Sequence, residues 1–129
     1  SLVATKADHI TSGQLNNLVG LLRDMLGEPF MRANARQSGL LAIASVRATT
    51  QETRLWQGEA LQFVRGVPNG RFDVVEVRPG EIPGQIPDRD SWNSFVFNIR
   101  EFAPPRLGAP FARPLPHINL DKVLQSLIA

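Results

Sequence analysis

Three carboxylates in one proline-rich loop form the densest set of potential metal ligands in the chain. They are Glu81, Asp88 and Asp90, within residues 79–92. Carboxylate oxygens bind hard divalent cations, and a cation held there would support a hydrolase or nuclease reaction. A charged loop of this kind is more often only solvated, so we expect no metal site.

Acid–base or nucleophilic chemistry would depend on two histidines, His9 and His117, near opposite ends of the chain. Cysteine and tyrosine are absent, which excludes thiolate metal sites and disulfides. Packing or capping is the simpler role for both histidines. The sequence has no Gly-x-Ser-x-Gly nucleophile turn and no glycine pattern that cradles phosphates. We therefore predict no catalytic residue, no cofactor and no enzymatic activity.

Arginine carries almost all of the positive charge. Twelve arginines stand beside two lysines, and the formal net charge is +2. Arginine pairs with carboxylates and phosphates and stacks on flat groups, although a codon bias toward arginine would give the same composition. Tryptophan and arginine are frequent hot spots of protein interfaces, so we predict a protein-binding surface in the second half of the chain. Its residues are Trp92, Arg89, Arg100, Arg106, Phe111 and Arg113.

Hydrophobic spacing predicts the elements that position these residues. A helix is expected over 13–26, ended by Gly27 and Pro29. A short apolar run predicts a strand over 39–47, and alternating residues predict strands over 71–78 and 94–102. A final short helix is expected after its cap at Asn119.

Residues 50–65 fit two structures. A hairpin would pair 53–57 with 60–65 around a turn at Gly58 and Glu59. A helix is the alternative, since Thr49 and Glu52 have the spacing of a capping box. Glycine inside that helix would cost about 1 kcal/mol relative to alanine. We therefore favour the hairpin.

Together these elements predict an α+β fold, with an antiparallel β-meander of about five strands and an N-terminal and a C-terminal helix. The 129 residues suit a single domain. Residues 1–12 are expected as a flexible arm and residues 103–117 as a proline-rich extended strap. No apolar run is long enough to span a membrane.

The scarcity of catalytic side chains favours a non-enzymatic structural or assembly protein, such as a small subunit of a virion, a phage tail or a secretion machine. Its partners would be proteins, in a homo-oligomer or a larger assembly. A nucleic-acid-binding module that uses arginines and sheet aromatics is the first alternative, although acidic residues interrupt any polybasic tract. A metal-dependent hydrolase or nuclease is the second alternative.

Overall fold

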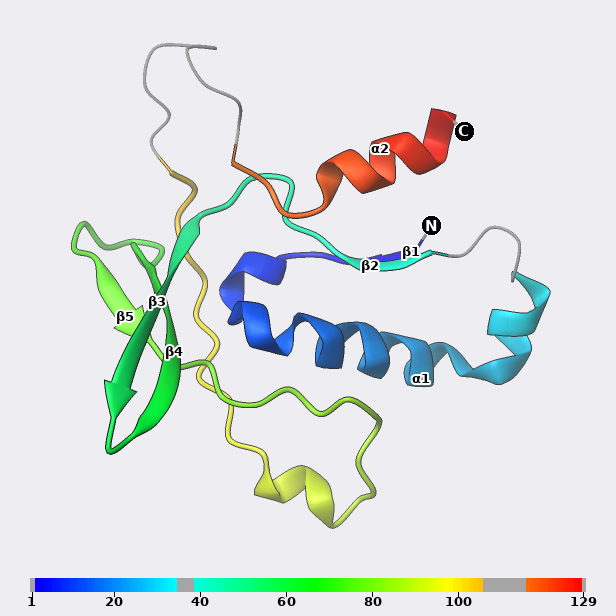
Figure 1. Cartoon of the computed structure of the whole chain (residues 1–129), viewed down its shortest axis with the longest axis horizontal. Coiled ribbons are helices and arrows are strands. Elements are labelled where there is room, and N and C mark those ends of the chain that lie inside the picture. Colours follow the sequence, from blue (N-terminus) through cyan, green and yellow to red (C-terminus); the bar gives the residue numbers. More distant parts are fainter. Residues whose placement is uncertain (1, 35–38, 106–115, 129) are drawn as a thin grey trace.

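The computed structural model describes residues 2–34, 39–105 and 116–128. Within them, two small sheets and two α-helices are joined by loops and short 3₁₀ turns (Figure 1). One sheet is a parallel pair of strands, and the other is an antiparallel sheet of three strands. The predicted mixture of helices and antiparallel strands is confirmed, but a single five-stranded meander is not.

The parallel pair joins the start of the chain to a strand that follows the first helix. β1 (Leu2–Ala4) pairs with β2 (Leu40–Ala42), and α1 (Leu15–Ala33) contacts both strands. Parallel neighbours need such a crossover. Three apolar residues are too few to show a period, so β1 is not recognisable in the sequence. Residues 2–12, expected as a flexible arm, form β1 and the 3₁₀ turns η1 (Ala7–His9) and η2, which starts at Ser12.

α1 is interrupted where the sequence predicts a helix end. Gly27 has φ 76° and ψ 160°, outside the helical region, and Pro29 follows in the second helical segment. Proline lacks a backbone N–H but is tolerated in the first turn of a helix. The expected helix over 13–26 therefore corresponds to the first segment of α1. The second segment was missed because a Gly–Pro signal marks a break and does not show that a helix resumes.

Residues 49–66 form the favoured hairpin, so the helical alternative is wrong. β3 (Thr49–Trp56) and β4 (Glu59–Gly66) pair in antiparallel fashion along their whole length. Gln57 and Gly58 make the turn with φ of 48° and 82°, and two-residue hairpin turns of type I′ require positive φ at both positions. The turn lies one residue earlier than predicted.

The two strands expected after the hairpin are much reduced. β5 (Val75–Val77) completes the antiparallel sheet beside β4, whereas Phe72 is 91% exposed and belongs to no strand. The strand expected over 94–102 is wrong. The structure has the 3₁₀ turn η3 (Ser91–Ser94) and then extended chain. Alternating aromatics predict a strand only if a neighbour accepts its hydrogen bonds, and within the described residues only Phe102 forms a β-bridge there.

The last described segment returns to the end of β2. Ile118 and Ala44 form an antiparallel bridge, and Asn119 Nδ2 donates to the carbonyl oxygen of Ala42 at 3.0 Å. α2 (Leu120–Ile128) follows, as predicted, and lies on the opposite side of the β1–β2 pair from α1 (Figure 1). Residues 106–115, most of the expected strap, lie outside the described residues.

The loop that follows β5 is fixed to one side of α1 by polar side chains. Gln14 Oε1 accepts the Ile82 N–H at 2.7 Å, and Asn17 Nδ2 donates to the Ile82 carbonyl oxygen at 2.9 Å. Asp24 Oδ2 accepts the Ile86 N–H at 2.7 Å. Because Asn17 and Asp24 are about two turns apart, both lie on the same helix face. The loop is therefore attached along the helix.

Gly20 stands where α1 and this loop approach each other most closely. A Cβ atom at this position would lie 2.6 Å from the Gly84 carbonyl oxygen. Replacing glycine by alanine inside a helix ordinarily stabilises it by roughly 0.5–1 kcal/mol. We expect Gly20→Ala instead to lower the free energy of unfolding by about 1–3 kcal/mol, because the loop must move. Urea unfolding followed by circular dichroism measures this change.

Asn16→Ala is the matched control for Gly20→Ala, because residue 16 is an exposed position of the same helix. It should leave the free energy of unfolding equal or slightly higher, since alanine has the better helix propensity. An equal or higher stability for Gly20→Ala would contradict the close approach of loop and helix.

One buried cluster joins the antiparallel sheet to residues 101–104, which we call the closing segment. Val64 is fully buried and packs with Val77 and Phe102, and Ala48 is packed against the same cluster. Among the described helices, none is both long and apolar enough to cross a membrane, which agrees with the sequence-based expectation. The cluster places the closing segment beside the turns that follow β1 and β2.

Candidate nucleotide-base site

A cavity of about 320 Å³ opens at the carboxyl ends of β1 and β2. We call it the β1–β2 cavity. Parallel α/β sheets bind ligands in the crevice outside the carboxyl ends of their strands, and small-molecule pockets have volumes of roughly 300–1,000 Å³. The position and the size are therefore those of a ligand site. The residues that matter below are Lys6, Asp8, Ser45, Val46, Phe102 and Pro104, all of which line it.

The first wall is the sharp turn that follows β1. Lys6 has φ 56° and ψ 34°, in the left-handed region. A residue with a Cβ atom held there costs of the order of 1–3 kcal/mol, and such strain clusters at functional sites. The Ala7 N–H donates to the Ile43 carbonyl oxygen at 2.9 Å and so ties the turn to the end of β2. The turn leaves Asp8 only 2% exposed.

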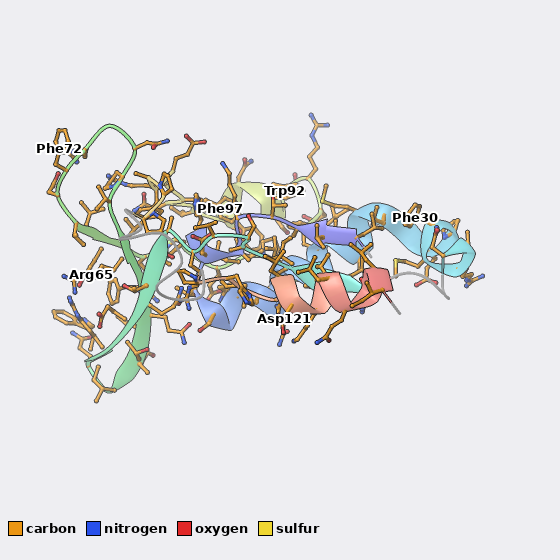
Figure 2. The ribbon with its side chains drawn as sticks, turned by 90° about the horizontal axis from the view of Figure 1, so that it is seen from above. Phe30, Arg65, Phe72, Trp92, Phe97 and Asp121 are labelled. Carbon is orange, nitrogen blue, oxygen red and sulfur yellow. The ribbon has the colours of Figure 1, made fainter. Side chains whose placement is uncertain are left out.

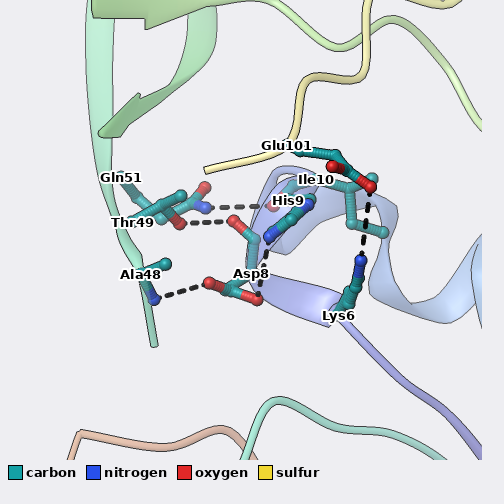
Figure 3. A network of polar contacts seen from close by, with 8 residues as sticks. All are labelled: Lys6, Asp8, His9, Ile10, Ala48, Thr49, Gln51 and Glu101. Carbon is teal, nitrogen blue, oxygen red and sulfur yellow. Dashed lines mark hydrogen bonds and ion pairs between the residues drawn. The ribbon is translucent and has the colours of Figure 1, made fainter. Parts of the chain in front are cut away.

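Hydrogen bonds from β3 and from the residue just before it hold Asp8 in place (Figure 3). The Ala48 N–H donates to Asp8 Oδ2 at 2.7 Å, and the Thr49 hydroxyl donates to the Asp8 carbonyl oxygen. Gln51 Nε2 donates to the Ile10 carbonyl oxygen at 3.1 Å just beyond. A buried carboxylate must be hydrogen-bonded, but an ionised carboxylate has about four acceptor positions. The side chain is therefore fixed and can still accept hydrogen bonds from a ligand.

The second wall follows β2 and offers backbone donors. The N–H groups of Ala44 and Arg47 donate to carbonyl oxygens of residues 118 and 116, at 3.1 and 2.7 Å. Between them, the N–H groups of Ser45 and Val46 have no acceptor within the part of the chain that the structure describes. The cavity therefore combines a carboxylate acceptor with backbone donors. Such a combination suits a small planar ligand whose edge carries both donors and an acceptor.

The closing segment forms the third wall. The Asn69 N–H donates to the Glu101 carbonyl oxygen at 3.0 Å, and the Ala103 N–H donates to the Val67 carbonyl oxygen at 2.8 Å. Lys6 Nζ lies 3.7 Å from Glu101 Oε1. Both side chains of this ion pair are exposed, so it contributes little stability. The backbone hydrogen bonds to residues 67 and 69 therefore hold this wall in place.

The acidic loop considered for metal binding has a local structural role. Asp88 Oδ1 accepts the Ser91 N–H at 2.7 Å at the start of η3. Hydrogen bonds from the Ser91 side chain and backbone hold the pKa of Asp88 below its ordinary value of 3.8. Within the described ranges, no group of three or more histidine, aspartate or glutamate side chains converges on a site for a metal ion.

The two histidines lie in different environments. His9 packs edge-on against the Phe102 ring with centroids 5.5 Å apart, and its Nε2 lies 4.0 Å from Asp8 Oδ1. His117 Nδ1 lies 3.9 Å from Asp121 Oδ1 at the start of α2. Only His9 is therefore part of the β1–β2 cavity.

The predicted protein-binding residues are only partly described. Trp92 is 41% exposed in η3, packs edge-on against Phe95 and lies at the molecular surface (Figure 2). Arg89 and Arg100 are exposed. The remaining three, Arg106, Phe111 and Arg113, lie outside the described residues. A binding role for this set stays a prediction.

Sequence analysis missed Lys6, Asp8, Ser45 and Val46 as site residues. In the sequence, Thr5, Lys6 and Asp8 follow the apolar run Leu2-Val3-Ala4, but this run is too short to identify β1 as a buried strand. Polar residues directly after a buried parallel strand lie where ligands bind. The position of these polar residues indicates a ligand site only when the parallel pairing of β1 with β2 is known.

Comparison with known proteins identifies relatives along the whole chain. The model of the YcjX-like family, DUF463, matches residues 1–129. A protein of Escherichia coli K12 named Ras-like GTPase YcjX is 36% identical over 129 residues, which are 97% of this chain and 27% of the relative. A protein of the same name from Shewanella oneidensis is 32% identical over 130 residues, 97% of this chain and 26% of the relative. The chain spans about a quarter of the length of these relatives.

These relatives overturn the predicted function. Proteins named as GTPases contradict a non-enzymatic structural or assembly protein of a virion, phage tail or secretion machine, and they contradict the expected lack of enzymatic activity. The prediction was wrong because it equated few catalytic side chains with no catalysis, whereas phosphoryl transfer depends mostly on positioning and electrostatics. With a family match over its full length, the chain belongs to the YcjX-like family.

Proposed function

We propose that the β1–β2 cavity binds the base of a guanine nucleotide, and that this chain is the base-recognising part of a GTP-hydrolysing protein. The observation that carries the proposal is the buried Asp8 carboxylate in a cavity at the carboxyl ends of two parallel strands. The names of the two relatives support it independently.

The polar groups of the cavity complement guanine and conflict with adenine. Guanine presents two donors, N1–H and the 2-amino group, beside the acceptor O6. Asp8 can accept from both donors, and the N–H groups of Ser45 and Val46 are available to O6. Adenine would bring a lone pair at N1 toward the carboxylate and an amino group toward the backbone donors. Leaving such buried groups unpaired is costly.

The proposal for this chain is limited to base recognition. The chain contains no Gly-x-x-x-x-Gly-Lys-[Ser/Thr] sequence, the pattern whose backbone cradles nucleotide phosphates. Lys6 lines the cavity, and the aliphatic stem of a lysine packs well on flat apolar surfaces. We therefore assign base selectivity to this chain and derive no phosphate chemistry from it.

Competitive displacement of a fluorescent guanine nucleotide from the full-length protein tests this function. GDP should displace the probe at concentrations roughly 10²–10⁴-fold lower than ADP, because a site built around specific hydrogen bonds strongly rejects a base that cannot form them. Magnesium and salt are held constant so that the phosphate contribution is the same for both nucleotides. Equal displacement by GDP and ADP would contradict guanine recognition.

A further inference from the structure

Phe102 lies beside two residues that flank the Asp8 carboxylate, His9 and Ala48. Its ring packs edge-on against His9, whose Nε2 lies 4.0 Å from Asp8 Oδ1. Ala48, which donates its N–H to Asp8 Oδ2 at 2.7 Å, packs against the buried cluster to which Phe102 belongs. Phe102 is therefore linked to Asp8 Oδ1 through His9 and to Asp8 Oδ2 through Ala48.

The antiparallel sheet sets the position of the Phe102 ring. Phe102 forms a β-bridge with Pro68, and its side chain packs on Val64 and Val77. Gly66 makes room for it, because a Cβ atom at residue 66 would lie 2.7 Å from Phe102 Cδ1. The ring is therefore held from the side of β4 and β5, although it lines a cavity formed by β1 and β2.

We propose that Phe102 is a positioning residue for guanine recognition. Held by the antiparallel sheet, it fixes His9 and Ala48, and through them it keeps the Asp8 carboxylate aligned with the 2-amino group of the base. Hydrogen bonds weaken steeply when their geometry is lost, so a small displacement of Asp8 reduces selectivity. This inference rests on the proposed function.

Comparison of GDP with IDP isolates this role, because inosine is guanosine without the 2-amino group. In the full-length wild-type protein, GDP should bind about 10- to 100-fold more tightly than IDP, the effect of one hydrogen bond to a charged group. Phe102→Leu keeps an apolar side chain but removes the aromatic edge, and Gly66→Ala displaces the ring from the far side. Both variants should reduce the GDP/IDP ratio about 3- to 10-fold.

Gly20→Ala is the stability control, because it should loosen the protein at Gly84, and residue 20 neither lines the β1–β2 cavity nor belongs to the buried cluster of Phe102. It should lower thermal stability but leave the GDP/IDP ratio at the wild-type value. Equal loss of the ratio in Gly20→Ala, Phe102→Leu and Gly66→Ala would show a general loosening and overturn the positioning role.

Asp8→Asn separates failure of this inference from failure of the proposed function. If Asp8→Asn abolishes the GDP/IDP preference while Phe102→Leu and Gly66→Ala keep the wild-type ratio, Phe102 has no positioning role and guanine recognition stands. If the wild type does not distinguish GDP from IDP, or Asp8→Asn leaves the preference intact, the proposed function itself fails.

Discussion

Replacing Asp8 by asparagine should transfer the nucleotide preference from guanine to xanthine. An asparagine side chain presents a donor where the carboxylate accepts, and it meets the 2-amino donor of guanine with a second donor. Two hydrogen bonds to a charged group, worth roughly 1.5–3 kcal/mol each, would be lost. The affinity for GDP should therefore fall about 10²–10⁴-fold. Xanthine carries a C2 carbonyl oxygen in place of the amino group and can accept from the new amide.

The fold should survive this substitution, because asparagine has the shape of aspartate. Its carbonyl oxygen can still accept the Ala48 N–H that now binds Asp8 Oδ2. Isothermal titration calorimetry with GDP and with xanthosine diphosphate (XDP) measures the change of nucleotide preference. Asp73→Asn changes an exposed aspartate and should leave both affinities unchanged. An Asp8→Asn protein that binds GDP as tightly as the wild type would remove Asp8 from the site.

Gly80→Ala should cause the largest loss of stability among single glycine replacements in the loops. Gly80 has φ 96°, a conformation that costs a residue with a Cβ atom about 1–3 kcal/mol. The added Cβ would also lie closer than 3.0 Å to the Val96 carbonyl oxygen, which belongs to backbone and cannot rotate away. Overpacking adds about 1–3 kcal/mol. We expect a total loss of roughly 2–6 kcal/mol in the free energy of unfolding.

Gly70→Ala is the control for this experiment, because Gly70 also has positive φ, 76°, but a Cβ there would meet nothing within 4 Å. It should cost only the conformational part, about 1–2 kcal/mol. Urea unfolding of both variants gives the difference, and hydrogen exchange at the Asn98 N–H, which donates to the Pro79 carbonyl oxygen at 2.9 Å, localises it. Equal losses for the two variants would contradict the close approach of residues 80 and 96.

Local signals in the sequence predicted the elements that depend on local chemistry. The break in α1 follows from Gly27 and Pro29, and the β3–β4 hairpin follows from the turn residues near Gly58. The strand expected over 94–102 failed because a strand also needs a hydrogen-bonded neighbour. Apart from the bridge at Phe102, the described chain provides only isolated hydrogen bonds there, such as that from the Asn98 N–H to the Pro79 carbonyl oxygen, and no ladder.

The candidate site could not be predicted to the same degree. Asp8 looked like one polar residue in a loose terminus, since its burial depends on β3, which begins about forty residues later. β1 has only three residues, so its sequence is too short to show that the segment is a buried strand. Composition suggested that chemistry was absent, whereas base recognition needs one well-placed carboxylate and backbone amides. Only the three-dimensional arrangement brings these groups together.

The dispersed origin of the cavity walls has a consequence for biosynthesis. A ribosome delivers the N-terminus first, so the strained turn at Lys6 and Asp8 emerges well before Ala48, and long before Phe102 supplies the final wall. Until residue 102 has been added and packed, the third wall is missing, so under the proposed function the growing polypeptide lacks a complete site for the base. Under the proposed function, loading with nucleotide should therefore come after synthesis of this region rather than during it.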